Sequence, residues 1–160
     1  MAVNAYLVID GTPGPSTSKT NAIDVMSFSF GASMSHAIGT GTSGAGGRAG
    51  RADLSDLTIM KALDKTSPLL FDHCVTGNIL TKVELLYDKP VGDKPTDYFK
   101  VELTDALISS IQFSGSNENP MESISFAFKK AALSYDDEKA DGTMTGFVTK
   151  GFDLLTLKAF

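Results

Sequence analysis

A glycine-rich run in the first third of the chain gives the strongest formal match to a chemical motif. The segment Gly39-Thr40-Gly41-Thr42-Ser43-Gly44 fits the G-x-G-x-x-G pattern of dinucleotide sites, and Asp64 follows about 20 residues later, where a ribose-binding carboxylate would stand. That pattern binds pyrophosphate only where it joins a strand to the N-terminus of a helix. Here glycines continue to Gly50, and a strand-like alternation follows. The run therefore predicts an extended Gly-rich loop over residues 39–50 and no cofactor.

His73 and Cys74 are sequence neighbours, which raises a thiolate–imidazole pair as a second possibility. Adjacent residues on a helix point about 100° apart, so the two side chains cannot share a proton across one face. Cys74 recurs with Leu70 and Phe71 at helical spacing, which indicates a small core residue. His36 is the other histidine, and no pattern places it beside Cys74. Two histidines and one cysteine without paired spacing predict no transition-metal site.

Carboxylates are densest in Asp136-Asp137-Glu138, which Asp141-Gly142 follow. Their spacing differs from that of an EF-hand loop, where acidic residues alternate before a central glycine. The segment indicates a solvated turn. The sequence also has no G-x-S-x-G nucleophile motif, so we expect a protein that is not an enzyme.

The elements that must carry these residues are mostly strands. Period-two alternation, the pattern of half-buried strands, covers most of the chain. It predicts strands over residues 5–9, 23–31, 52–59, 79–87, 98–113, 123–135 and 147–157. In the second of these, Met26 and Phe28 are expected on the core face, and Val25, Ser27 and Ser29 on the other. The predicted fold class is all-β with one short α-helix, as a closed barrel or a sandwich.

The helix is predicted from Ser67, a good N-cap, through Pro68 to a terminating Gly77. Its expected buried face consists of Leu70, Phe71, Cys74 and Val75.

Small uncharged polar residues lie opposite the large apolar residues of three strands. They are Ser27 and Ser29, then Ser110, Gln112 and Ser114, then Ser123 and Ser125 with Lys129. Exposed strand faces usually carry charges that discourage aggregation. Two readings stay open: an ordinary solvated sheet face, or a smooth polar wall lining a shared space. Arg48 and Arg51, at the end of the glycine run, could reach a neighbour's carboxylates or be placed there by chance.

Composition narrows the class of protein. The chain has 160 residues, 42% hydrophobic and 21% charged, which predicts a single domain over residues 1–160. A net charge of −5 argues against binding nucleic acid or anionic lipid. The N-terminus has no basic region before its short apolar stretch, so we expect folding in the cytoplasm without a signal peptide, and no membrane insertion.

Taken in order, several segments resemble the haemolysin-coregulated protein (Hcp) family, the tube subunits of the bacterial type VI secretion system. No single motif is diagnostic, but the ordered set spans nearly the whole chain. The matching segments are residues 5–11, 23–31, 54–77 with Asp64-Lys65-Thr66-Ser67-Pro68, 107–110, 125–128 and 139–142.

The resemblance implies a tail-tube-like β-barrel of two sheets flanked by one helix, assembled as a homohexameric ring. Rings would stack into a tube inside contractile sheath proteins, with a spike protein at the tip and effector proteins in the lumen. Sheath contraction would expel the tube into the extracellular space or a target cell. The chain ends soon after its last predicted strand, so no fused toxin domain is expected. The alternatives are a tail-tube protein of a phage-like or contractile bacteriocin particle, or an independent small-molecule-binding β-barrel.

Two sets of residues follow as candidates for this assembly. The lumen-facing set is Ser27, Ser29, Ser110, Gln112, Ser123 and Ser125. The ring-stacking set is Gly39, Gly41, Gly44, Gly46, Gly47, Arg48 and Arg51.

Overall fold

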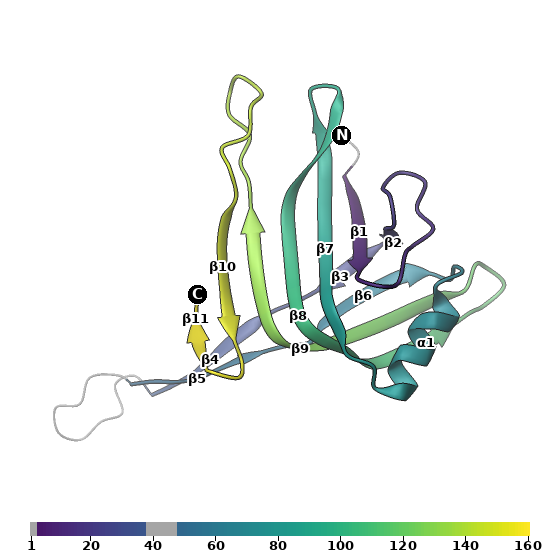
Figure 1. Ribbon diagram of the computed structural model, residues 1–160, viewed down its shortest axis with the longest axis horizontal. Coiled ribbons are helices and arrows are strands. Elements are labelled where there is room, and N and C mark those ends of the chain that lie inside the picture. Colours follow the sequence, from purple (N-terminus) through teal and green to yellow (C-terminus); the bar gives the residue numbers. More distant parts are fainter. Residues whose placement is uncertain (1–2, 38–47) are drawn as a thin grey trace.

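The computed structural model describes residues 3–37 and 48–160, and at 36, 37, 48 and 49 the backbone alone (Figure 1). Its strands are β1 (Asn4–Ile9), β2 (Ile23–Val25), β3 (Ser27–Ser29), β4 (Ala32–Ala37), β5 (Arg48–Leu54), β6 (Leu57–Ala62), β7 (Leu80–Val91), β8 (Lys94–Ser114), β9 (Met121–Tyr135), β10 (Val148–Asp153) and β11 (Lys158–Ala159). The helix α1 spans Ser67–Thr76. The predicted all-β fold with one short helix is confirmed.

Nine of these strands belong to one antiparallel sheet that wraps around a single core. Its main order is β11-β10-β9-β8-β7-β1-β2, and β6 joins β9 to β3. Only Met26 separates β2 from β3, so residues 23–29 contact β1 at one end and β6 at the other. The strands therefore enclose a barrel-like core, although no continuous hydrogen-bonded ladder runs all the way around it. The two sheets expected for the barrel are two layers of this one large sheet, and the separate second sheet is the small β4–β5 hairpin.

The large sheet forms two layers because β8 and β9 are long and bend, as Figure 1 shows. β7 pairs with β8 as far as Ala106, and β6 pairs with β9 from Met121 to Phe126. Two irregularities in the middle of β8 accommodate the change of direction. Asp105 has a φ of 50°, and Ser109 is an extra residue in the β8–β9 register. One layer is therefore β3-β6-β9-β8, and the other contains β1, β7 and the remaining halves of β8 and β9.

The core lies between these layers. It is aliphatic with one fully buried aromatic ring, and its largest fully buried apolar side chains are Leu7, Ile23, Leu57, Ile59, Leu70, Leu85, Leu103, Ile108, Ile124 and Phe126.

The expected alternation over residues 23–31 is wrong at Met26. Met26 N donates to Met60 O at 2.8 Å although Ser27 is the residue paired with Met60, so two residues oppose one in a β-bulge. The bulge shifts the buried positions, so Val25 is buried before it and Phe28 packs on the core after it. Met26, predicted to be in the core, is 64% exposed.

The helix boundaries are predicted to within one residue. Thr66 occupies the N-cap position that the sequence assigned to Ser67, and Gly77 ends the helix in the left-handed conformation, with φ 63°. The predicted buried face is only partly right. Leu70 is buried and Cys74 packs against the core, but Phe71 and Val75 are 49% and 63% exposed.

Candidate functional site

The polar residues predicted from three separate strands lie on one face of the β3-β6-β9-β8 layer. Strand register places them in two neighbouring rows across that layer, and we call this surface the polar face. The first row is Ser29, Thr58, Ser125 and Ser110; the second is Ser27, Met60, Ser123 and Gln112. All six predicted residues are therefore brought together.

The sequence prediction missed the β6 members of both rows. Thr58 and Met60 occupy the alternate positions between Leu57, Ile59 and Lys61, all of which are buried. That alternation was visible in the sequence, but the residues did not form a serine run. Lys129, grouped with Ser123 in the sequence, lies elsewhere: its Nζ is 3.8 Å from a carboxylate oxygen of Asp105, at the bend.

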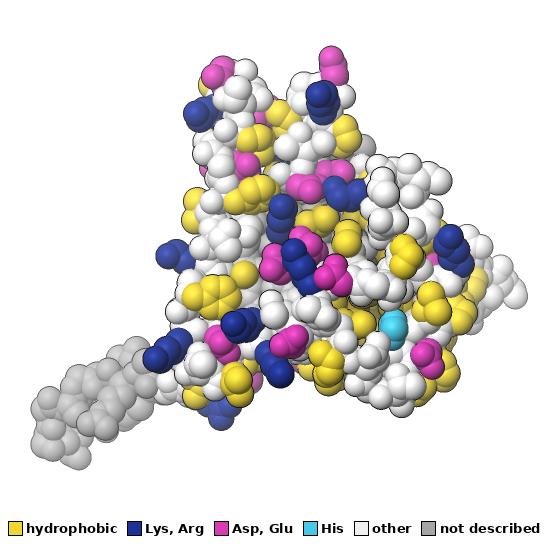
Figure 2. Space-filling view, viewed as in Figure 1, with side chains coloured by type: hydrophobic (Ala, Val, Ile, Leu, Met, Phe, Trp, Pro, Cys, Tyr) yellow, Lys and Arg dark blue, Asp and Glu magenta, His cyan; other side chains and the backbone are white. Residues whose placement is uncertain are grey.

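No residue in either row is charged. The hydroxyls of Thr58 and Ser125 are 2.9 Å apart, and the Ser109 hydroxyl donates to Asp56 Oδ2 at 2.6 Å beside them. The other layer differs, because Lys82 contacts both Glu84 and Glu102, at 3.1 and 3.8 Å. Figure 2 shows acidic and basic side chains gathered over β7 and β8. Charged pairs therefore lie on the layer that contains β1 and β7, whereas the two rows of the polar face carry none.

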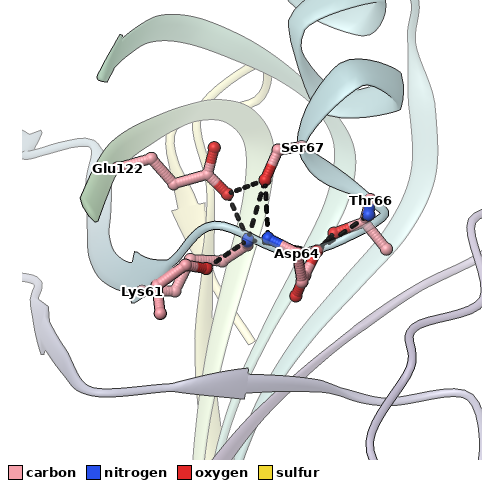
Figure 3. A network of polar contacts seen from close by, with 6 residues as sticks. Lys61, Asp64, Thr66, Ser67 and Glu122 are labelled. Atoms are coloured by element: carbon pink, nitrogen blue, oxygen red, sulfur yellow. Dashed lines mark hydrogen bonds and ion pairs between the residues drawn. The ribbon is translucent and has the colours of Figure 1, made fainter. Parts of the chain in front are cut away.

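A buried ion pair lies directly behind the polar face (Figure 3). Lys61 and Glu122 are cross-strand partners on β6 and β9, their side chains are fully buried, and they form a salt bridge. The Ser67 hydroxyl donates to Glu122 Oε1 at 3.0 Å and accepts from Asp64 N at 3.1 Å. Asp64 Oδ1 in turn accepts from Thr66 N at 2.8 Å. The ion pair thus links the N-terminus of α1 to β6 and β9, the two central strands of the β3-β6-β9-β8 layer.

His73 and Cys74 do not form a reactive pair. The Nε2 of His73 is 3.0 Å from Thr12 Oγ1, and its Nδ1 is 3.0 Å from Asn78 Nδ2. Both ring nitrogens are therefore hydrogen-bonded to side chains outside the helix. Cys74 packs against the core as predicted. Among the described residues, no group of three or more His, Cys, Asp or Glu side chains could hold a metal ion.

The acidic run after β9 is a structured turn. Asp136 is buried and accepts from Gly146 N at 2.8 Å and from Thr145 Oγ1 at 3.2 Å. Further along, hydrogen bonds from the hydroxyl and N–H of Thr143 lower the pKa of Asp141.

An apolar groove lies between the base of the β4–β5 hairpin and β9–β10. Its volume is about 240 Å³, its lining includes Phe30, Leu54, Leu133 and Phe152, and the one charged lining residue is Lys150. This lining offers no acid–base or nucleophilic pair. In the part of the chain that the structure describes, no helix is long and apolar enough to cross a bilayer.

The predicted stacking set is only partly visible. Gly39, Gly41, Gly44, Gly46 and Gly47 lie outside the described residues. The loop predicted over residues 39–50 is wrong at its end, because residues 48–50 belong to β5, which pairs with β4. Arg51 is an exposed residue of the same strand, and its N–H donates to Ser35 Oγ at 2.9 Å.

Comparison with known proteins places this geometry in a family. The family described as "Type VI secretion system effector, Hcp" matches residues 6–135. Protein hcp1 of Pseudomonas aeruginosa is 33% identical over 150 residues, covering 91% of each chain. A solved structure described as a type six secretion system protein superposes with a TM-score of 0.88 at 28% identity, over 99% of this chain and 100% of that one. Hcp1 from Salmonella typhimurium shares the fold, with a TM-score of 0.75 at 24% identity over the whole of both chains.

The family match covers most of the chain, and the Pseudomonas relative is similar over nearly its full length. The chain therefore belongs to the Hcp family and is a secreted tube subunit of a type VI secretion system.

Proposed function

We propose that six copies of this chain form a ring whose inner wall is the polar face. The observation that carries the proposal is the pair of uncharged rows crossing all four strands of the β3-β6-β9-β8 layer. Hydroxyl and amide groups make hydrogen bonds of modest net strength, so a folded passenger could bind the wall reversibly and still slide.

The edges of this layer support ring closure. Among the described strands, β3 pairs only with β6, and β8 beyond Ala106 pairs only with β9. Every neighbouring pair in the layer is antiparallel, and the layer has an even number of strands, so its two edge strands run in opposite directions. A second copy added edge to edge would therefore continue the antiparallel order. Six such layers would give about 24 strands, which at about 4.8 Å spacing make a circle about 37 Å across.

The remaining roles follow from this ring. Rings would stack into a tube that carries effector proteins, inside a contractile sheath and behind a spike protein, and the subunit itself would have no enzymatic role. The subunit would assemble in the cytoplasm without a signal peptide and leave the cell as part of the type VI secretion apparatus. The Gly-rich segment 39–50, whose last three residues belong to β5, would contact the adjacent ring together with Arg48 and Arg51. Ordering a loop costs conformational entropy, so isolated rings should stack weakly.

Light scattering on a size-exclusion column tests the ring. We expect a particle of about six times 16.9 kDa, and annuli in negative-stain images. A monomer with no annuli at any concentration would overturn the ring. Shortening residues 39–50 should abolish tube formation at high concentration and leave single rings, and undiminished tubes would refute the stacking role.

A further inference from the structure

Three of the chain's six methionines lie on or beside the polar face, where the sequence pattern drew attention only to serines and Gln112. Met60 lies on β6 directly opposite Ser123, and Met121 is two residues before Ser123 on β9. Such diagonal neighbours have Cα atoms about 7–8 Å apart, within reach of long side chains. Met26, at the bulge, donates its N–H to Met60 O. We call these three residues the methionine patch.

Ring closure would leave the centre of the patch uncovered. Met60 and Met121 belong to β6 and β9, which are the two inner strands of the layer, whereas a neighbouring copy would join at β3 and β8. Met60 is 42% exposed in the single chain. This differs from Phe71 and Phe113, whose rings are 6.3 Å apart beside the β8 edge, where a second copy would pack.

We propose that the methionine patch binds apolar side chains presented by a passenger polypeptide inside the tube. This proposal rests on the proposed function, in which the polar face is the lumen wall. The surrounding rows carry no charge, so they offer a passenger no ion pair. Methionine is unbranched and polarizable and adapts to differently shaped partners, a property of surfaces that bind many sequences.

Six weak patches in one ring could together retain a passenger that a single patch would release. A single patch exposes little apolar area and would bind weakly on its own. Six patches around one lumen would raise the effective concentration for every further contact of the same passenger. A passenger would then stay in the tube without a sequence-specific binding site, and the hydroxyls between the patches would let it move along the wall.

The test uses two uncharged peptides as probes: a fluorescent Gly/Ser peptide that carries several leucines, and the same peptide with every leucine replaced by serine. We expect the assembled ring to bind the leucine peptide at least about tenfold more tightly, measured by fluorescence anisotropy. The double variant Met60→Ser/Met121→Ser should remove this preference. The matched control Leu155→Ser/Leu157→Ser changes two exposed leucines in the turn after β10 and should retain it.

The outcomes separate the patch from the ring. Equal binding of both peptides by wild-type rings would overturn the patch and leave the tube intact. Preference retained in the methionine variant, or lost equally in the leucine control, would also overturn it. If the chain stays monomeric, the ring fails, and the patch is judged on the monomer at higher peptide concentration. A weaker leucine preference should then still be lost in Met60→Ser/Met121→Ser and kept in the leucine control, and its absence would overturn the patch.

Discussion

Lys61 and Glu122 face each other across β6 and β9, with their charged ends sealed from water behind the polar face. Lys61 Nζ also donates to Ala62 O at 3.0 Å, and Glu122 Oε1 accepts from Ser67. Glu122 Oε2 has no hydrogen-bond partner among the described residues. The pair therefore joins β6 and β9 to α1 at the cost of burying two charges.

Removing one partner of this pair should destabilise the fold strongly. Lys61→Met leaves Glu122 buried without a cation, and Glu122→Gln leaves Lys61 with only the partly exposed carboxylate of Asp64, at 3.4 Å. Each variant should therefore lower the free energy of unfolding by about 3–5 kcal/mol in urea titrations. The double variant Lys61→Met/Glu122→Leu should recover most of that loss. Lys130→Met, which removes the half-exposed lysine of the pair with Asp153, is the control and should cost at most about 1 kcal/mol. A double variant as unstable as either single one would contradict this account.

A bulky residue in the first polar row should affect passengers more than the ring. Ser29 is exposed on β3, and its row crosses the centre of the proposed wall. Ser29→Phe should leave the ring mass unchanged by light scattering and reduce the amount of effector that co-purifies with it, because one added phenyl group from each subunit would narrow the lumen. Thr17→Phe, in the exposed loop between β1 and β2, should change neither. Unaltered effector recovery with Ser29→Phe would remove this residue from the wall.

Gly151 should tolerate no side chain. It exchanges two backbone hydrogen bonds with Phe160, at 2.8 and 2.9 Å, and a Cβ there would lie 2.4 Å from Phe160 Cζ and 2.8 Å from Ala131 O. Gly151→Ala should therefore cost about 1–3 kcal/mol in urea unfolding and speed hydrogen exchange in β11. At Gly115 a Cβ would meet nothing closer than 3.5 Å, so Gly115→Ala is the control and should be nearly neutral. Equal stability of the two variants would show that β11 shifts freely.

Most strand segments, the helix limits to within one residue and the grouping of the six polar residues could be predicted from the sequence. The order of the strands in the sheet could not, and the single strand predicted over residues 52–59 is wrong, because that segment contains the end of β5 and the start of β6, which belong to different sheets. Period-two alternation is local, so it correctly placed Ser110 and Gln112 of β8, and Ser123 and Ser125 of β9, on the face opposite the core. The rows across the layer depend on register, which pairs residues as distant as Thr58 and Ser125 and has no local signal.

Two kinds of feature could not be read locally. The bulge at Met26 reverses which residues are buried, because an extra residue resets the alternation without any glycine or proline to mark it. The buried Lys61 was equally hidden, since a lysine in a strand normally indicates an exposed position. Its burial is explained by its partners in the fold, chiefly the cross-strand Glu122, together with Asp64 and Ala62 O.

Tyr87 should make the protein less stable in alkali. Burial, with a smaller contribution from Tyr98, raises the pKa of its phenol above the ordinary value of 10.0. The folded state therefore keeps this proton at a pH where the unfolded chain has lost it, so the stabilisation is complete below about pH 10 and is lost as the pH rises through the folded-state pKa. Burial also raises the pKa of Tyr6, and a hydrogen bond with Glu84 raises that of Lys82. Both groups therefore also contribute stability that is lost as the pH rises.

Tyr87→Phe keeps the ring that packs edge-on against Phe28 and Phe99, at 5.4 and 6.1 Å, and removes only the ionisable group. We expect the loss of unfolding free energy between about pH 8 and about pH 11 to be smaller in this variant than in the wild type, by urea titration. Phe99→Leu, which alters the same cluster without changing a titratable group, should lower stability equally at both pH values. If Tyr87→Phe loses as much unfolding free energy at high pH as the wild type does, the loss comes from other groups. Tyr6 and Lys82 would then be the next candidates, because their pKa values are also raised.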